Sequence, residues 1–215
     1  MTRIIVGLHG NTGAGKDTVA DYMCRKHGFR AVAFADALKS DLSAMFDAPV
    51  NLFTDRSTKQ VPTTCLTLDR CKSDKFVDWF IGTSAGETEA GNMGESMMHL
   101  PRSPRWIMQT YGTDYCRSLN SPYWIDRLQH TLAEFDDDAK VVISDVRFVD
   151  EAYFVKSESD LNEVWEVIRM NNPHHDKNDR HASNIRLPSV DRVLFNSGTI
   201  NQLWRKIDRA VEVVL

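Results

Sequence analysis

A glycine-rich stretch near the start of the chain, GLHGNTGAGKDTVADYM at residues 7–23, constrains the possible folds most strongly. Its glycines and lysine have the spacing G-x-x-x-x-G-K, in which glycines let backbone N–H groups turn toward phosphate oxygens. A short apolar run at residues 4–8 precedes this loop, and apolar residues at helical spacing follow it at residues 16–26. The loop is predicted to join a buried strand to a helix whose N-terminal end favours anions, which indicates nucleotide-phosphate binding. The residues predicted to bind ATP phosphates are Gly10, Asn11, Gly13, Ala14, Gly15, Lys16, Asp17 and Thr18.

The residue that follows Lys16 departs from the usual pattern, because Asp17 stands where a Ser or Thr normally holds Mg²⁺. A carboxylate at a helix N-terminus is favourable by about 0.3–1 kcal/mol, so Asp17 could be only a helix-start residue. Beside phosphates it would be repelled unless a cation lies between them, and carboxylates are natural ligands of Mg²⁺. We therefore predict that Asp17 binds Mg²⁺ directly or through water, while Thr18 donates to a phosphate.

Short apolar runs that alternate with helical patterns predict an α/β fold. Strands are expected at residues 4–8, 31–35, 140–146, 163–170 and 192–195, and helices at 16–26, 36–46, 104–119, 122–135, 148–155 and 200–214. This order predicts a three-layer arrangement with a parallel sheet of about five strands. Ligands in such sheets bind beyond the C-terminal ends of the strands, where Asp36, the residues 145–147 and the residues 196–198 are expected.

Residues 47–103 interrupt this order with prolines and with glycines clustered between residues 82 and 94. We expect a partly helical insertion, with a helix around residues 74–81 and a flexible stretch at 82–94. Its aromatic residues could form either a homodimer contact or a small buried core; they are Phe76, Trp79 and Phe80.

Composition excludes several classes of function. The net charge of −4 argues against broad binding to nucleic acid, which needs a basic surface. The apolar runs are too short to span a bilayer, and no secretory signal opens the chain, so a soluble cytoplasmic protein is expected. The four cysteines form no C-x-x-C pair and are expected to be reduced thiols.

Five motifs occur in the order typical of deoxynucleoside monophosphate kinases of tailed bacteriophages: GLHGNTGAGKDTVADYM, FADALK, PRWIMQTYGTDYCR, VVISDVRFVDEA and LFNSGTINQLW. The chain resembles that family over most of its length, and least over residues 47–103. The resemblance implies one adenylate-kinase-like P-loop domain over residues 1–215, with residues 47–103 on the acceptor side. It also implies the Mg²⁺-dependent reaction ATP + dNMP → ADP + dNDP, located in the host cytoplasm if the protein is phage-encoded.

The helix predicted at residues 104–119 carries the expected acceptor site. Gln109, Thr113 and Arg117 are four residues apart and share one face. A Gln can read a base edge, and an Arg can hold a phosphate in a fork. Arg105, and less clearly Arg102, could meet the same phosphate near the helix start; ordinary solvent-facing residues are the alternative.

Two residues after the second predicted strand are further candidates for acceptor binding. Asp36 could hold a sugar hydroxyl or orient arginines, and it could equally be a helix cap. Lys39, one turn later, could reach a phosphate, although an exposed lysine is the simpler interpretation.

The remaining candidates follow later strands. Asp145, at the end of a buried strand, is suited to hold the water shell of Mg²⁺, and Arg147 could face the phosphates; a structural ion pair is the alternative. By the resemblance, Asn196 and Gly198 contact the adenine of ATP. The polar segment 171–188 would form a lid that excludes water, with Arg180 as its catalytic cation, or else a disordered loop.

No nucleophilic side chain is needed for this reaction, because an oxygen of the acceptor phosphate attacks the γ-phosphorus while Lys16 follows the transferred group. Small nucleotides are the expected partners. Alternatives are another small-molecule kinase, acting on a ribonucleotide or on phosphomevalonate, and a non-catalytic nucleotide-binding module. The G-K-D sequence also occurs in phosphomevalonate kinases of animal type.

Overall fold

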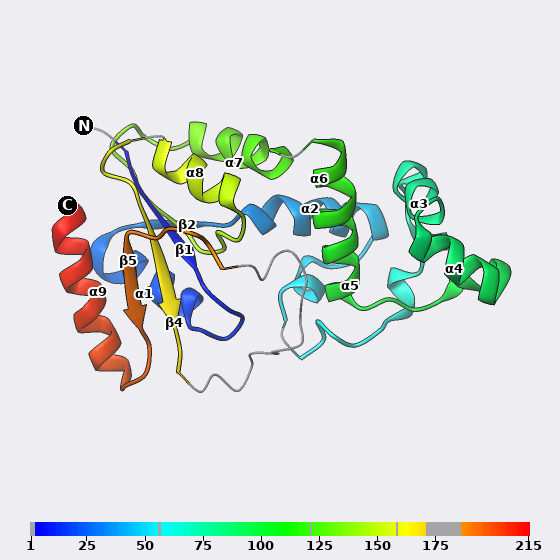
Figure 1. Cartoon of the computed structure of the whole chain (residues 1–215), viewed down its shortest axis with the longest axis horizontal. Coiled ribbons are helices and arrows are strands. Elements are labelled where there is room, and N and C mark those ends of the chain that lie inside the picture. The colour runs from blue at the N-terminus through cyan, green and yellow to red at the C-terminus, as the bar shows by residue number, and fades with distance from the viewer. Residues whose placement is uncertain (1–2, 56, 121, 158, 171–185) are drawn as a thin grey trace. The chain divides into compact units, whose positions relative to one another are not determined.

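The computed structural model describes residues 3–55, 57–120, 122–157, 159–170 and 186–215. The chain forms two compact units: Met1–Phe34 with Trp124–Leu215, and Ala35–Tyr123. Figure 1 shows the helices and strands of both units. Among the described residues, no helix is both long enough and apolar enough to cross a membrane.

The first unit contains the parallel sheet predicted from the sequence. Among the described residues its strands are β1 (Ile4–His9), β2 (Arg30–Val32), β3 (Lys140–Ile143), β4 (Glu163–Ile168) and β5 (Arg192–Phe195). They lie in the order β2-β3-β1-β4-β5, and every neighbouring pair is parallel. This confirms the predicted α/β fold. β2 and β3 end earlier than expected, because the chain enters a helix at Phe34 and a turn at Ser144.

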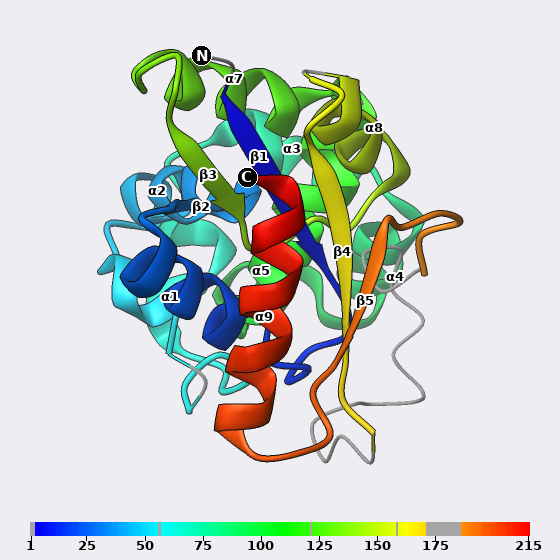
Figure 2. The same cartoon turned by 90° about the vertical axis from the view of Figure 1, so that its left-hand side faces the viewer.

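Helices cover the two faces of this sheet (Figure 2). α1 (Lys16–His27) and α9 (Ile200–Val214) pack on the face that carries Val6 and Leu8. α8 (Val149–Ser157) packs on the opposite face, where a Cβ at Gly7 would meet Val155 at 3.2 Å. α7 (Tyr123–Ala133) buries the apolar residues Trp124, Ile125, Leu128 and Leu132.

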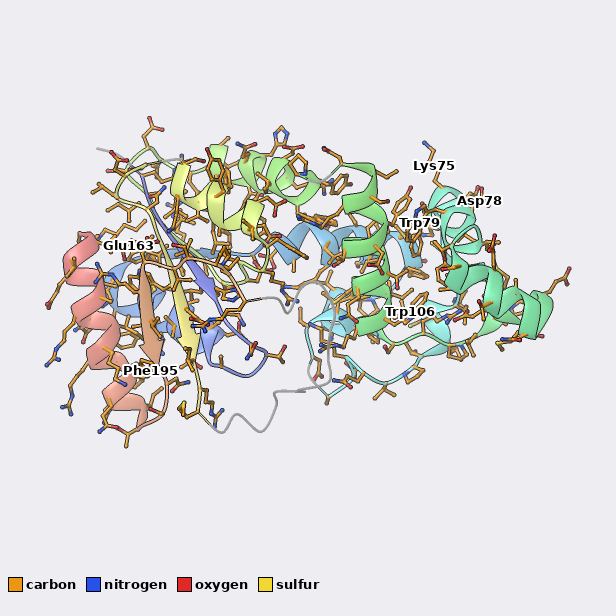
Figure 3. The ribbon with its side chains drawn as sticks, viewed as in Figure 1. Lys75, Asp78, Trp79, Trp106, Glu163 and Phe195 are labelled. Carbon is orange, nitrogen blue, oxygen red and sulfur yellow. The ribbon has the colours of Figure 1, made fainter. Side chains whose placement is uncertain are left out.

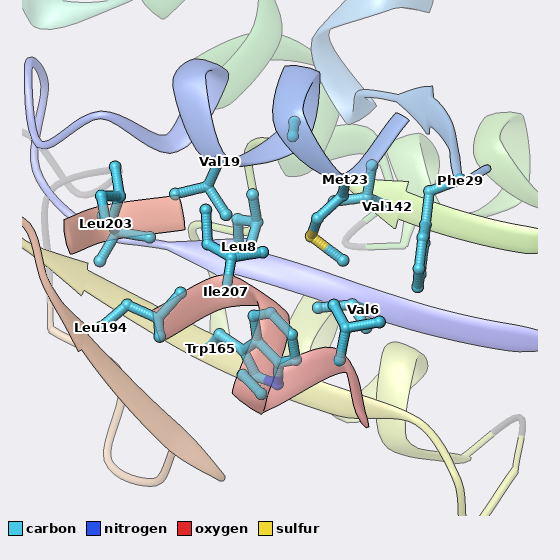
Figure 4. Packing of buried hydrophobic residues seen from close by; sticks show 14 of the residues in the cluster. Val6, Leu8, Val19, Met23, Phe29, Val142, Trp165, Leu194, Leu203 and Ile207 are labelled. Atoms are coloured by element: carbon cyan, nitrogen blue, oxygen red, sulfur yellow. The ribbon is translucent and has the colours of Figure 1, made fainter. Parts of the chain in front are cut away.

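The main core lies between the sheet, α1 and α9. Trp165 of β4 is fully buried there with Leu8, Met23 and Ile207 (Figure 4). At the rim of this core, Tyr22 stacks on Trp204 with ring centroids 5.1 Å apart. Burial of these large apolar side chains fixes α1, and therefore the loop that precedes it, against the sheet.

The second unit is mainly helical. Its elements are α2 (Phe34–Phe46), α3 (Asp74–Ile81), α4 (Ser84–Met93), α5 (Pro104–Gln109), a π-helical turn (Thr110–Tyr115) and α6 (Cys116–Leu119), with short 3₁₀ turns between them. The predicted helix at 74–81 is confirmed, and the helical stretch at 104–119 is confirmed with a π-turn inside it.

Two local predictions for this unit are wrong. Residues 82–94 are not a flexible stretch, because most of them form α4, which begins where the Thr83 hydroxyl accepts a hydrogen bond from the Gly86 N–H at 3.1 Å. Asp36 is not a helix cap, because α2 already begins at Phe34 and places Asp36 in its first turn.

The aromatic residues of α3 form a small buried core within the second unit. Phe76 and Phe80 are buried, and the Phe76 ring lies edge-on to Tyr111 at 5.3 Å. Figure 3 shows Trp79 on α3 and Trp106 on α5. Arg102 is buried, pairs with Glu89, and lies 4.4 Å from the centroid of the Trp106 ring. Arg102 therefore has a structural role and is not the solvent-facing residue that was one of its two readings.

Candidate active site

The phosphate loop of the first unit has the backbone shape that only glycines allow. Gly10, Gly13 and Gly15 have positive φ angles of 137°, 78° and 104°. A Cβ on Gly10 would lie 2.3 Å from the carbonyl oxygen of Val167, and a Cβ on Gly15 would lie 2.4 Å from Nδ2 of Asn196. The glycines thus permit both the turn and its close approach to β4 and to the chain after β5.

Lys16 is the first residue of α1, and its side chain reaches back over the loop. Its Nζ donates to the carbonyl oxygens of Gly10 at 2.5 Å and Asn11 at 3.2 Å. The cation is held at the N-terminal end of a helix, where phosphate oxygens are stabilised by backbone N–H groups. Asp17 and Thr18 follow it and are exposed in the first turn of the same helix.

Asn196, which follows the edge strand β5, anchors the loop. Its Nδ2 donates to the carbonyl oxygen of buried Ala14 at 2.8 Å. It comes directly after β5, whose last residue, Phe195, is labelled in Figure 3. The sequence predicted contact with ATP for Asn196; the structure adds that this residue positions the loop itself.

A basic hollow begins beside this anchor. It has a volume of about 350 Å³, within the range of small-molecule sites. Lys206 donates to the carbonyl oxygen of Phe195 at 2.6 Å, so its ammonium is held beside β5. The lining residues are Ser197, Gly198, Gln202, Arg205, Lys206 and Arg209. Sequence reasoning found only residues 197 and 198 among them, because basic residues on a terminal amphipathic helix are common on ordinary solvent-facing surfaces.

The turn after β3 lies at the same edge of the sheet, since β3 is the neighbour of β1. Asp145 Oδ1 accepts a hydrogen bond from the Phe34 N–H at 2.8 Å. The N–H groups of Arg147 and Phe148 both donate to Oε2 of buried Glu151, at 2.8 and 3.1 Å. The turn is therefore held by side chains at both of its ends.

Two buried polar residues near the loop escaped the sequence analysis. His9, the last residue of β1, is hydrogen-bonded through Nδ1 to the carbonyl oxygen of Val146 at 3.0 Å, and burial lowers the pKa of its imidazole. Glu166 lies opposite His9 in the parallel register and accepts a hydrogen bond from Arg186 at 3.1 Å. The sequence signal that could have found them is a polar residue near the end of an apolar strand.

The carboxylates of this unit fit a site for Mg²⁺ that is shared with phosphates. Among the described residues, no cluster of three or more His, Cys, Asp or Glu side chains is arranged to hold a metal. Mg²⁺ usually keeps several waters and takes one or two carboxylates together with substrate phosphates. Asp17 and Asp145, at one edge of the sheet, match that need without an all-protein cage.

The acceptor residues predicted at positions 105–117 belong to consecutive helical segments of the second unit. Gln109 ends α5, Thr113 lies in the π-turn and Arg117 lies in α6; all three are partly buried. The backbone N–H of Arg105 donates to the carbonyl oxygen of Lys59 at 2.8 Å, which fixes the start of α5. π-turns inside helices often occur at functional sites, and this one separates Gln109 from Arg117.

The α2 residues predicted for the same site pair with each other. Lys39 Nζ lies 2.9 Å from Asp36 Oδ1, with 20% of the lysine side chain and 59% of the aspartate side chain exposed. Lys39 is therefore not a fully exposed lysine. Arg180 and residues 171–185 of the predicted lid lie outside the described residues.

Gly112 lets the π-turn pack closely against α2. A Cβ at this position would lie 2.7 Å from Cδ2 and 3.1 Å from Cδ1 of buried Leu38. We expect Gly112→Ala to destabilise the protein by about 1–3 kcal/mol in urea unfolding, because an extra methyl overpacks this contact. In a double-mutant cycle with Leu38→Ala, the double variant should be more stable than the two single effects predict. Strictly additive effects would contradict the contact.

Comparison with known proteins matches the chain to one family model and to two viral proteins. A family model described as deoxynucleotide monophosphate kinase matches residues 89–207. A protein of Acanthamoeba polyphaga mimivirus named as a deoxynucleotide monophosphate kinase is 27% identical over 224 residues, covering 97% of this chain and 96% of that protein. The deoxynucleoside-5′-monophosphate kinase of Escherichia phage T5 is 26% identical over 189 residues, covering 74% of each chain. Among solved structures, dephospho-CoA kinase from Campylobacter jejuni is 11% identical, with a TM-score of 0.40 and coverage of 99% of this chain and 97% of that one.

Proposed function

Because the chain belongs to the deoxynucleotide monophosphate kinase family, we propose that it transfers the γ-phosphate of ATP to a deoxynucleoside monophosphate. The observation that carries this proposal is the loop of residues 10–18, with the Lys16 ammonium held across it at the carboxyl edge of a parallel sheet. We further propose that the reaction takes place in the cytoplasm, which is that of the host if the protein is phage-encoded.

The donor would bind the first unit. Its phosphates would take the backbone N–H groups of the loop, and Lys16 would exchange its two carbonyl contacts for phosphate oxygens. The base and sugar would extend past Asn196 into the basic hollow, which begins one residue later at Ser197. Asp17 and Asp145 would hold Mg²⁺, directly or through water, and when bound the ion would neutralise charge on the transferred phosphoryl group.

The acceptor would bind the second unit. Arg117 and Arg105 would hold the monophosphate, which leaves one of its oxygens to attack the γ-phosphorus in line with the leaving ADP. Gln109 would hydrogen-bond the base, and the Asp36–Lys39 pair would contact the sugar or the phosphate. That oxygen is already ionised near neutral pH, so the chain needs no general base.

The function is tested by ADP release in a coupled assay with a panel of acceptors: the dNMPs, the NMPs, phosphomevalonate and no acceptor. We expect release that requires Mg²⁺ and is fastest with one or more dNMPs. Faster release with an NMP or with phosphomevalonate would assign another small-molecule kinase. Release that is absent throughout, together with measurable ATP binding, would assign a non-catalytic nucleotide-binding module.

The donor assignment predicts a selective effect of the basic hollow. In the double variant Arg205→Gln/Arg209→Gln, we expect the KM for ATP to rise about tenfold, which corresponds to about 1.4 kcal/mol of lost binding. The KM for the dNMP should change less than twofold, because neither arginine belongs to the second unit.

The matched control is Arg25→Gln/Lys26→Gln, which removes two exposed positive charges from the last turn of α1. This control separates contact in the hollow from the general effect of net charge on an anionic substrate. Equal rises in the KM for ATP in both double variants would show that the hollow does not bind ATP.

A further inference from the structure

His9 lies between two parts of the proposed donor site, the phosphate loop and the turn of residues 145–147. It ends β1, and the next residue, Gly10, begins the phosphate loop. Its side chain contacts the turn, because Nδ1 lies 3.0 Å from the carbonyl oxygen of Val146. Val146 stands between Asp145 and Arg147 in the chain.

The backbone alone does not complete this junction. The ladder between β1 and β3 ends at the pair Gly7 and Ile143, and past it the Val146 N–H still donates to the Leu8 carbonyl oxygen at 3.1 Å. The Val146 carbonyl oxygen takes its hydrogen bond from His9. The imidazole thus adds one hydrogen bond between β1 and the turn, beyond the last backbone bond that joins them.

The surroundings define the chemical state of this imidazole. A carbonyl oxygen can only accept, so Nδ1 must carry the proton. His9 is 7% exposed, which favours the neutral ring. Burial has the largest effect on the pKa of His9 and lowers it. The hydrogen bond to Val146 and the charge of Glu166 from β4 act in the opposite direction, and the charges of Lys16 from α1 and of Arg186 lower the pKa further. His9 is therefore a neutral, buried donor with one orientation.

We propose that His9 is a positioning residue for phosphoryl transfer, which holds the Asp145–Arg147 turn against the phosphate loop. This inference rests on the proposed function, since it assigns Asp145 and Arg147 to the reacting phosphates. His9 itself touches neither substrate in this scheme. Its hydrogen bond fixes the distance between the phosphate loop and the Asp145–Arg147 turn, which must act on the same phosphate. A misplacement of about 1 Å can cost about 10²-fold in rate.

Three substitutions at His9 test this proposal. His9→Leu replaces the imidazole by an apolar side chain of similar bulk and removes the donor, and we expect kcat to fall about 10- to 100-fold. His9→Asn places an amide donor near the position of Nδ1 and should recover most of the lost kcat. His9→Gln carries the same amide one methylene farther out and should recover less. The KM for ATP should stay within threefold in all three variants, because the loop glycines and Lys16 remain.

A second readout does not depend on activity. Hydrogen exchange at the Val146 amide reports whether the turn stays on β1. We expect exchange to accelerate in His9→Leu and to stay near the wild-type rate in His9→Asn. Equal kcat in the Leu and Asn variants, or unchanged exchange in His9→Leu, would overturn the proposal. If wild-type protein phosphorylates no acceptor while the exchange pattern holds, the proposed function fails and the positioning of the turn by His9 stands.

Discussion

Lys16→Met is expected to lower kcat by about 10²–10³-fold, the loss typical when one preorganised electrostatic group is removed from a reacting centre. Lys16 is the cation that the first unit holds directly over the phosphate loop, through carbonyl contacts at 2.5 and 3.2 Å. Met keeps the length and much of the apolar contact of the side chain but cannot follow the transferred phosphate. The measurement is the rate of dNDP formation at saturating ATP, dNMP and Mg²⁺.

The fold should survive this change, because the core of the unit does not include the Lys16 ammonium. A melting temperature within a few degrees of the wild type is therefore expected. Lys26→Met is the matched control, since Lys26 is an exposed lysine in the last turn of the same helix. If Lys16→Met retains more than a tenth of the wild-type kcat, the loop of residues 10–18 does not hold the transferred phosphate.

Much of the first unit could be predicted because its local patterns agree with its tertiary environment. Residues 4–8 and 192–195 are short apolar runs that become strands, and Ile200–Val214 has an apolar stripe that packs on the sheet. The phosphate loop could be predicted from its glycine spacing, because Gly10, Gly13 and Gly15 can take the positive φ angles that the loop needs.

The second unit was harder to predict because tertiary contacts override its local preferences. α4 contains two glycines, which disfavour a helix, yet Thr83 caps it and a Cβ at Gly86 would meet the Phe80 carbonyl at 2.0 Å. Close packing against α3 therefore requires a glycine inside this helix. The local sequence pattern around Gly86 does not indicate this contact with Phe80.

The roles of single polar residues were also beyond the sequence. Asn196 was expected to meet ATP, but its bond to the Ala14 carbonyl depends on strands that are far apart in the chain. His9 was not singled out in the sequence, because its bond to Val146 depends on the sheet order. A spacing pattern can place a residue at the edge of a sheet, but it does not give the partner across that edge.

Asp145→Asn is expected to raise the Mg²⁺ concentration needed for half-maximal activity by about 10- to 100-fold, the usual cost of losing a carboxylate around a metal. The substitution is matched to the structure, because Oδ1 of Asn can still accept the hydrogen bond that the Phe34 N–H makes to Asp145 at 2.8 Å. The free energy of unfolding should therefore change little, and the weaker binding of Mg²⁺ should come from the missing negative charge.

A substitution at Asp17 tests the other predicted Mg²⁺ ligand, and a second substitution at Asp145 separates the charge of its side chain from its hydrogen bond. Asp145→Ala removes both, and we expect it to cost about 1–3 kcal/mol in unfolding free energy, because the Phe34 N–H loses its acceptor. Asp17→Asn removes a charge from the exposed first turn of α1 and should also shift the Mg²⁺ dependence if Asp17 takes part in binding. An unchanged Mg²⁺ titration for Asp17→Asn would leave Asp17 as a helix-start residue, and the same result for Asp145→Asn would remove Asp145 from the metal site. Because all three variants are compared by titration at fixed ATP and dNMP, a general loss of activity cannot imitate a shift in the midpoint.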